Sequence, residues 1–147
     1  MLKEENKDRG DYLFVLSLAE ACDIVIGAKG SMHFPKGYYV YAGSAKKNLA
    51  ARLARHQRKR KHLHWHIDYL RQAAAVVAAI PIRTAADLEH SLAQAVGTVA
   101  DWRIDGFGCT DCTCPSHLFG FRDNPIHRRS FLQVVEDSRM NRLDEMI

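Results

Sequence analysis

The chain has 147 residues, of which 47% are hydrophobic, and its formal net charge is +4. This length suits one domain, and this apolar content can bury a core, which excludes an intrinsically disordered chain. The longest apolar stretch, residues 73–82, has about half the length of a membrane span, and the sequence MLKEENKDRGD has no secretory pattern. We therefore expect a cytoplasmic protein with no membrane partner.

The first third of the chain predicts strands. Residues 11–19 (DYLFVLSLA) combine aromatic and aliphatic side chains, and CDIVIGAKGS begins with a second short strand that runs into a turn. The sequence GYYVYAGS predicts a third strand that ends at a Gly-Ser turn. Alternation would place Tyr39 and Tyr41 on one face and Tyr38 on the other. We expect the three strands to form an antiparallel sheet.

The remainder of the chain predicts mainly helices. Residues 47–60 have apolar positions at helical spacing, and WHIDYLRQAA predicts a second, short helix. AVVAAIPI predicts a strand that is buried on both faces and ended by Pro81, and residues 128–147 predict a terminal helix. Residues 84–100 predict another helix, with Thr84 as N-cap, Asp87 in the first turn and a buried stripe of Leu88, Leu92, Ala95 and Val96.

These elements predict an α+β domain with a small, mostly antiparallel central sheet. We expect a flexible N-terminus at residues 1–9, the main domain at residues 10–121 and a C-terminal helical extension at residues 122–147.

Positive charge is concentrated in one segment. Residues 46–66 contain eight Lys or Arg and four His but no acid, whereas the rest of the chain has 13 basic and 17 acidic residues. Most charge runs are solvated helix faces, but such faces often include acids at i,i+4 spacing, and this run has none. Because Arg52, Arg55, His56 and Lys59 recur at three or four residues, we expect a basic helix face that binds a nucleic-acid backbone.

Several motifs occur in an order found in a known family. GDY (residues 10–12) begins the first strand, YAG (41–43) ends the third, NLAAR places Arg52 in the following helix, and Glu89 lies in a later helix. This order resembles the GIY-YIG nuclease domain. The phrases FPKGYYVYAGSA, RHQRKRKHLHWHIDYL and GFGCTDCTCPSHLF resemble its Uri-type branch, a small family of unknown function. The resemblance extends from residue 10 to about residue 121.

The resemblance implies an endonuclease that hydrolyses DNA phosphodiester bonds, with DNA repair as one context. Glu89 would bind one Mg²⁺ or Mn²⁺, Arg52 would hold the scissile phosphate, and Tyr41, with Tyr12 beside it, would position or deprotonate the attacking water. A tyrosine with an ordinary pKa of about 10 is a poor base, so the metal and the arginine would have to assist it. Substrate contacts are expected from Gly43, Ser44, Lys46, Arg55, His56, Arg58, Lys59, His64 and His66. Gly43 would also turn the chain into the helix.

The sequence departs from the broad family pattern in three places. Asp11 stands at a usually apolar position, and the interval from Tyr12 to Tyr41 is long enough to contain an extra strand near IGAKGSMHF. The asparagine that often follows the catalytic glutamate has Asn124 as its one candidate.

Two clusters and two rival functions stay open. HLHWHIDY allows helix entry with packing of Trp65, DNA contact, or metal binding by His64, His66 and Asp68. CTDCTCPSH favours a tight reduced loop near the site, from which Asp111 or His117 could face substrate. A structural Zn²⁺ there is the alternative, although its ligands fall within nine residues whereas most zinc sites join two separated pairs; they would be Cys109, Cys112, Cys114 and His117. The rival functions are a non-catalytic nucleic-acid-binding module and a small zinc-binding interaction domain with a protein partner.

Overall fold

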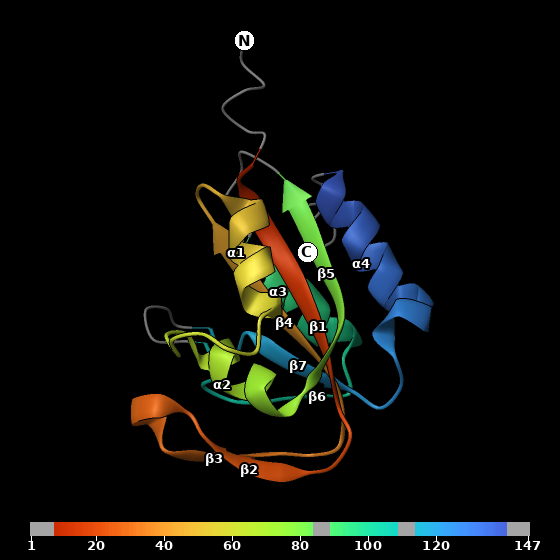
Figure 1. The fold of residues 1–147 in the computed structure, drawn as a ribbon. Coiled ribbons are helices and arrows are strands. Elements are labelled where there is room, and N and C mark those ends of the chain that lie inside the picture. The colour runs from red at the N-terminus through yellow and green to blue at the C-terminus, as the bar shows by residue number, and fades with distance from the viewer. Residues whose placement is uncertain (1–7, 84–88, 109–113, 141–147) are drawn as a thin grey trace.

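The computed structural model describes residues 8–83, 89–108 and 114–140. Its centre is an antiparallel five-stranded sheet (Figure 1), which confirms the predicted α+β class. The strand order is β5-β1-β4-β7-β6. The bounds are Gly10–Leu18 for β1, Gly37–Ala45 for β4, Ala75–Arg83 for β5, Trp102–Arg103 for β6 and Leu118–Phe121 for β7.

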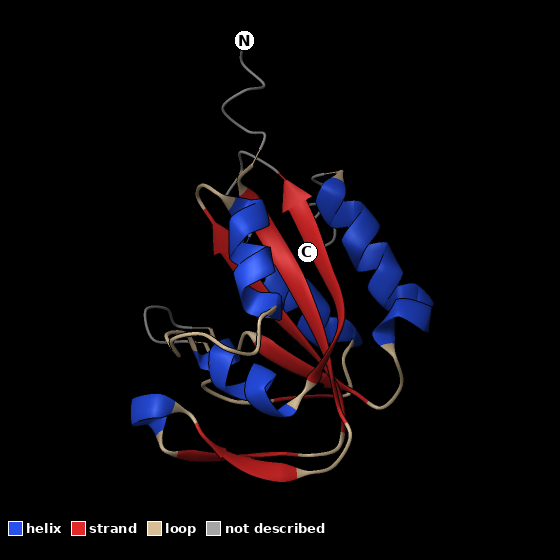
Figure 2. Cartoon of the chain, in the orientation of Figure 1, coloured by secondary structure: helices blue, strands red, loops and turns tan. Residues whose placement is uncertain are grey.

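Helices cover both faces of this sheet (Figure 2). Helix α1 (Leu49–Gln57) and helix α2 (His66–Ala73) pack with Tyr12, Phe14 and Leu16 on one face. Helix α3 (Glu89–Val99) and helix α4 (Arg129–Arg139) cover the other face, where their apolar side chains join those of the strand residues Leu13, Val15 and Val40. The predicted alternation is confirmed, because Tyr39 and Tyr41 belong to the first core and Tyr38 lies against the second.

The prediction that the second strand joins the main sheet is wrong. Strand β2 (Cys22–Val25) does not join the main sheet but pairs with β3 (Ser31–Phe34) in a separate hairpin, which contains the short 3₁₀ turn Gly27–Lys29. In the main sheet, β1 pairs directly with β4 and β5. The extra strand expected between Tyr12 and Tyr41 is therefore present as β3.

Strand β5 also differs from the prediction. It lies at the edge of the sheet with most of its side chains partly exposed, and it continues through Pro81 to Arg83. An edge strand tolerates proline because its outward-facing backbone groups have no strand partner. The carbonyl of Pro81 accepts hydrogen bonds from the Arg139 guanidinium of α4.

Helix α1 is shorter than predicted, because the backbone is already extended at Arg58. The described part of α3 confirms Leu92, Ala95 and Val96 as buried, whereas Thr84, Asp87 and Leu88 lie outside the described residues, as does most of the predicted flexible N-terminus. Helix α4 follows a 3₁₀ turn at Pro125–His127 and contributes Phe131 and Val134 to the core. Among the described residues, no helix is long and apolar enough to cross a membrane.

Candidate active site

A cavity of about 330 Å³ lies where β1 begins and β4 ends. It contains all four residues expected to be catalytic, which come from β1, β4, α1 and α3. Four of the nine expected substrate contacts also line it. The lining residues are Tyr12, Tyr41, Gly43, Ser44, Arg52, His64, Trp65, His66, Glu89, His90, Gly108 and His117.

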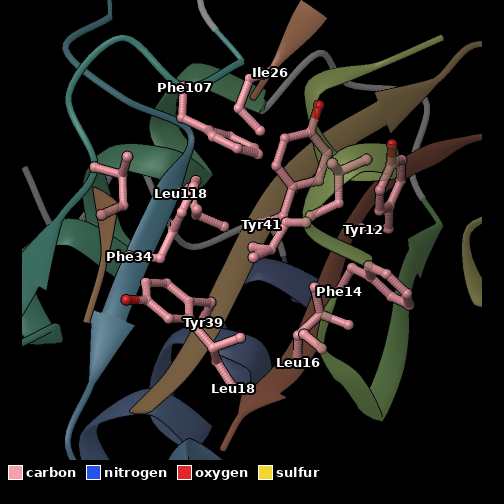
Figure 3. Packing of buried hydrophobic residues seen from close by; sticks show 14 of the residues in the cluster. Tyr12, Phe14, Leu16, Leu18, Ile26, Phe34, Tyr39, Tyr41, Phe107 and Leu118 are labelled. Atoms are coloured by element: carbon pink, nitrogen blue, oxygen red, sulfur yellow. The ribbon is translucent and has the colours of Figure 1, made fainter. Parts of the chain in front are cut away.

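Tyr12 and Tyr41 lie on adjacent strands of the same sheet face. Figure 3 shows their rings side by side with both hydroxyls directed toward the same end of the sheet, and the ring centroids are 6.2 Å apart. Tyr12 is opposite Gly43 in the register of β1 and β4, and Tyr41 is opposite Phe14. The antiparallel pairing thus places the two phenols together at the cavity.

Gly43 has a different role from the one predicted. It lies inside β4 rather than in a turn, so it does not redirect the chain into α1. A Cβ atom at this position would lie 2.5 Å from both Cζ and the hydroxyl oxygen of Tyr12. The absence of a side chain at Gly43 therefore makes room for the Tyr12 ring.

The substitution Gly43→Ala is expected to displace Tyr12 and to lower the free energy of unfolding by about 1–3 kcal/mol, as overpacking does in other cores. Urea denaturation of a double-mutant cycle with Tyr12→Ala measures the effect. In the Tyr12→Ala background the added methyl group has space, so most of the loss should disappear. An equal loss in both backgrounds would show that the Tyr12 contact is not the reason for the glycine.

Both tyrosines are phenols at neutral pH. Burial raises the pKa of Tyr12 to about 12, and the nearby Arg52 opposes this only partly. Burial also raises the pKa of Tyr41 well above its ordinary value, as do the negative charges of Glu89 and Asp68. A raised pKa makes each tyrosine a poorer base, and each hydroxyl group can instead orient a water.

His56 lies beneath Tyr12 rather than at the cavity wall. Its Nε2 atom is 2.8 Å from the Tyr12 hydroxyl, and its side chain is only 1% exposed. Burial lowers the pKa of His56, so its imidazole is neutral at pH 7. Because the Asp68 carboxylate lies 3.8 Å from Nδ1, it favours the tautomer with the proton on Nδ1, and Nε2 then accepts from Tyr12.

Asp68 is a buried acid that binds several residues of the basic segment. Its fully buried carboxylate accepts two hydrogen bonds of 3.1 Å from the Arg55 guanidinium and lies 3.4 Å from the Lys61 ammonium. It also accepts from the backbone N–H groups of His64 and Trp65 at the start of α2. Burial alone would raise the pKa of Asp68, but hydrogen bonds from its neighbours hold that pKa well below its usual range.

The basic segment is therefore partly compensated. Arg55 and Lys61 are paired with Asp68, so the expectation of an uncompensated helix face is wrong for them. Lys46, Arg58 and Lys59 are exposed but do not line the cavity, and Arg58 and Lys59 belong to the connection between α1 and α2 rather than to a helix. Of the three α1 residues Arg52, Arg55 and His56, Arg52 alone lines the cavity.

Arg52 is held at the cavity by two contacts. One guanidinium nitrogen donates to the Ser44 carbonyl at 3.0 Å, and the guanidinium lies 4.6 Å from the centroid of the Trp65 ring. Arg55 lies over the same ring at the same distance. Cation–π contact of this kind fixes the plane of a guanidinium, and this supports the packing role of Trp65 among the three readings of HLHWHIDY.

The two histidines beside Trp65 line the cavity without forming a metal cluster with Asp68. Helix α2 begins at His66, which directs Asp68 into the core while His64 and His66 reach the cavity. His66 accepts a hydrogen bond of 2.7 Å from the Gly108 amide through Nδ1. This bond connects α2 to the segment that leads toward the cysteines.

Glu89 enters the cavity from the first turn of α3. Its Oε1 accepts a hydrogen bond of 2.9 Å from the Ser44 hydroxyl, and its Oε2 lies 3.6 Å from Nδ1 of His117. Its side chain is 28% exposed, so the carboxylate can be reached from solvent. A single accessible carboxylate is a donor that Mg²⁺ or Mn²⁺ accepts, since Mg²⁺ keeps much of its water shell.

One unpredicted residue joins the site, and four sequence-based candidates lie outside the cavity or outside the described residues. His90 lines the cavity and was not predicted, because its position next to Glu89 gives no spacing signal for its neighbours Cys114 and His117. Cys109, Asp111 and Cys112 lie outside the described residues. Asn124 accepts from the Ile126 amide in a short 3₁₀ turn and is not a cavity residue, so it does not supply the missing family asparagine.

Comparison with known proteins assigns the chain to a family. The sequence model described as "Domain of unknown function DUF123" matches residues 11–140. The chain belongs to this DUF123 family. The match continues through helix α4, beyond the main domain expected from sequence. No curated protein and no solved structure gives a significant match.

Proposed function

We propose that this DUF123 protein is a metal-dependent endonuclease of the GIY-YIG type that hydrolyses DNA phosphodiester bonds. The observation that carries the proposal is the meeting of Tyr12, Tyr41, Arg52 and Glu89 in one cavity. These are the four positions for which the resemblance implies catalytic roles, and they come from four separate elements. A set of unrelated surface residues would have no reason to converge in this way.

Glu89 would hold the divalent ion, with the Ser44 hydroxyl fixing the orientation of its carboxylate. When bound, Mg²⁺ or Mn²⁺ would stabilise the negative charge that develops on the phosphate. Arg52 provides a second positive group, and its planar fork of donors matches phosphate oxygens. Because Ser44 contacts both Glu89 and Arg52, the end of β4 sets the spacing between these two groups.

Tyr12 and His56 supply a route for the proton of the attacking water. The Tyr12 oxygen accepts a hydrogen bond from water while its own proton is directed at Nε2 of neutral His56. As the water oxygen bonds to phosphorus and the P–O ester bond breaks, the water proton passes to Tyr12 and the Tyr12 proton to His56. Asp68 then stabilises the imidazolium. Tyr41 is placed to orient the same water, and solvent protonates the leaving oxygen.

A cleavage assay tests the proposal directly. Purified protein is incubated with supercoiled, branched, single-stranded and base-damaged DNA in the presence of Mg²⁺, Mn²⁺ or EDTA. The expected result is metal-dependent cutting of at least one substrate, which EDTA prevents and which Tyr12→Phe and Tyr41→Phe reduce. Tight DNA binding without cutting on any substrate would instead favour the binding-module alternative.

The exposed cations between α1 and α2 are expected to determine the affinity for DNA and not the rate of cleavage. Simultaneous replacement of Arg58, Lys59 and Arg60 by alanine should weaken DNA binding and lower the slope of log K against log salt by about one for each phosphate that the variant no longer neutralises. Lys61 is left unchanged, because its side chain is 2% exposed and donates to the carbonyls of Arg55 and His56.

Fluorescence anisotropy over a range of salt concentrations measures this slope. The matched control replaces three exposed cations outside the segment and removes the same net charge; they are Lys36, Arg122 and Arg129. An equal change of slope in both triple variants would show that net charge, and not this connection, determines binding.

A further inference from the structure

A second group of donor atoms lies beside Glu89. His90 in the first turn of α3, Cys114, and His117 just before β7 each place one ligand atom within 4.8 Å of the others. Nδ1 of His90 is 2.7 Å from Sγ of Cys114, and the two histidine rings have centroids 5.9 Å apart. Two imidazoles and one thiol therefore converge from segments that are distant in sequence.

The chemistry of these donors differs from that expected at Glu89. Mg²⁺ and Mn²⁺ prefer oxygen ligands, whereas nitrogen and sulfur together select Zn²⁺ or a similar transition metal. Three protein ligands are the number found in zinc sites that keep a fourth position open. The exposed side chain of His90 lines both the 330 Å³ cavity and a neighbouring cavity of about 570 Å³, so an ion can enter from solvent.

We propose that His90, Cys114 and His117 bind one zinc ion that is distinct from the magnesium or manganese ion of the proposed nuclease. This site differs from the four-ligand loop considered from sequence, because its first ligand comes from α3. The ion connects the start of α3 to the segment that enters β7, and both segments border the cavity.

The zinc site would also position Glu89. His90 follows Glu89 directly, and the Glu89 carboxylate lies 3.6 Å from His117. Carboxylates beside metal-bound histidines orient the ring and raise its basicity, and the same contact restrains the carboxylate. This consequence for cleavage rests on the proposed function, whereas zinc binding itself does not.

Metal titration of the full chain tests the site. The protein is stripped with a chelator and titrated with Zn²⁺, and bound metal is counted by mass spectrometry after dialysis. One tightly bound equivalent is expected. Titration with Co²⁺ should give a thiolate-to-cobalt charge-transfer band and the intense visible bands of tetrahedral cobalt.

Ligand variants decide whether these three residues form the site. His90→Ala, Cys114→Ser and His117→Ala should each weaken zinc binding more than 10-fold, and Cys114→Ser should remove the charge-transfer band. Cys22→Ser, in the separate β2–β3 hairpin, should keep both. Circular dichroism checks the fold, and His90→Ala is the most informative variant because this side chain is exposed.

Three results would overturn the inference: no stoichiometric zinc in the wild-type protein, full affinity in both His90→Ala and Cys114→Ser, or loss of zinc only in a Cys109→Ser, Cys112→Ser double variant. The readout is independent of catalysis. Zinc binding without any DNA cleavage would contradict the proposed nuclease but support the zinc site. DNA cleavage by a protein that binds no zinc would support the nuclease but contradict the zinc site.

Discussion

Glu89→Gln is expected to reduce metal-dependent DNA cleavage at least about 10²-fold, the loss that follows removal of one group that stabilises transition-state charge. The substitution removes the negative charge that would hold the divalent ion. It keeps an oxygen that can accept the hydrogen bond from Ser44, so the fold and the affinity for DNA should change little. Cleavage rates at saturating DNA, melting temperature and anisotropy together measure these three properties.

The matched control is Glu136→Gln on an exposed position of α4, outside the cavity. It makes the same chemical change and should leave cleavage unaffected. If Glu89→Gln cuts DNA as fast as wild type, the divalent ion is held elsewhere and the role of Glu89 is disproved. If Glu136→Gln loses as much activity as Glu89→Gln, the loss reports net charge rather than a metal ligand.

Asp68→Asn is expected to lower the free energy of unfolding by about 3–5 kcal/mol, the usual cost of removing one partner from a buried ion pair. The carboxylate is fully buried, and its loss leaves the Lys61 ammonium, itself 2% exposed, without its counter-charge. Asp101→Asn is the control, because Asp101 also accepts two bonds from an arginine, Arg128, but at the surface. Its loss should be about 1 kcal/mol or less.

The free energy of unfolding of the wild-type protein and that of Asp68→Asn should also depend differently on pH. The pKa of Asp68 is lower in the folded state than the ordinary unfolded value of about 3.9. Its stabilising contribution is therefore present above about pH 4 and is lost as the pH falls further. Denaturation at pH 7 and at pH 3 should show the difference between wild type and Asp68→Asn narrowing at the lower pH. A constant difference would assign the effect to packing instead of charge.

The secondary structure was predictable wherever apolar residues recurred at one constant spacing along a whole segment. Strands β1 and β4 and helices α2 and α3 have such patterns. The pairing of β2 was not predictable, because β3 is short and contains a polar Ser31 and an exposed His33, which weaken a strand signal. Pro81 was misinterpreted since proline stops a central strand but not an edge strand.

The four candidate catalytic residues were predictable only through the family resemblance, and the residues that support them were not predictable from sequence. Asp68 lies just beyond the basic segment, so a count of charges within residues 46–66 excludes the acid that neutralises part of it. Contacts such as Tyr12 with His56 and His90 with Cys114 join positions far apart in sequence. Spacing rules describe neighbours on one element and carry no information about such pairs.

The position of Pro81 has a consequence for self-association. In an antiparallel strand the N–H and C=O of one residue face the same way. The carbonyl of Pro81 is engaged by Arg139 of α4, so this position faces outward from β5, where proline has no N–H to offer. At the opposite edge, β6 is two residues long. Pro81 therefore interrupts the outward ladder of β5, and the short β6 presents little backbone at the other edge; both features disfavour edge-to-edge pairing with a second copy of the sheet.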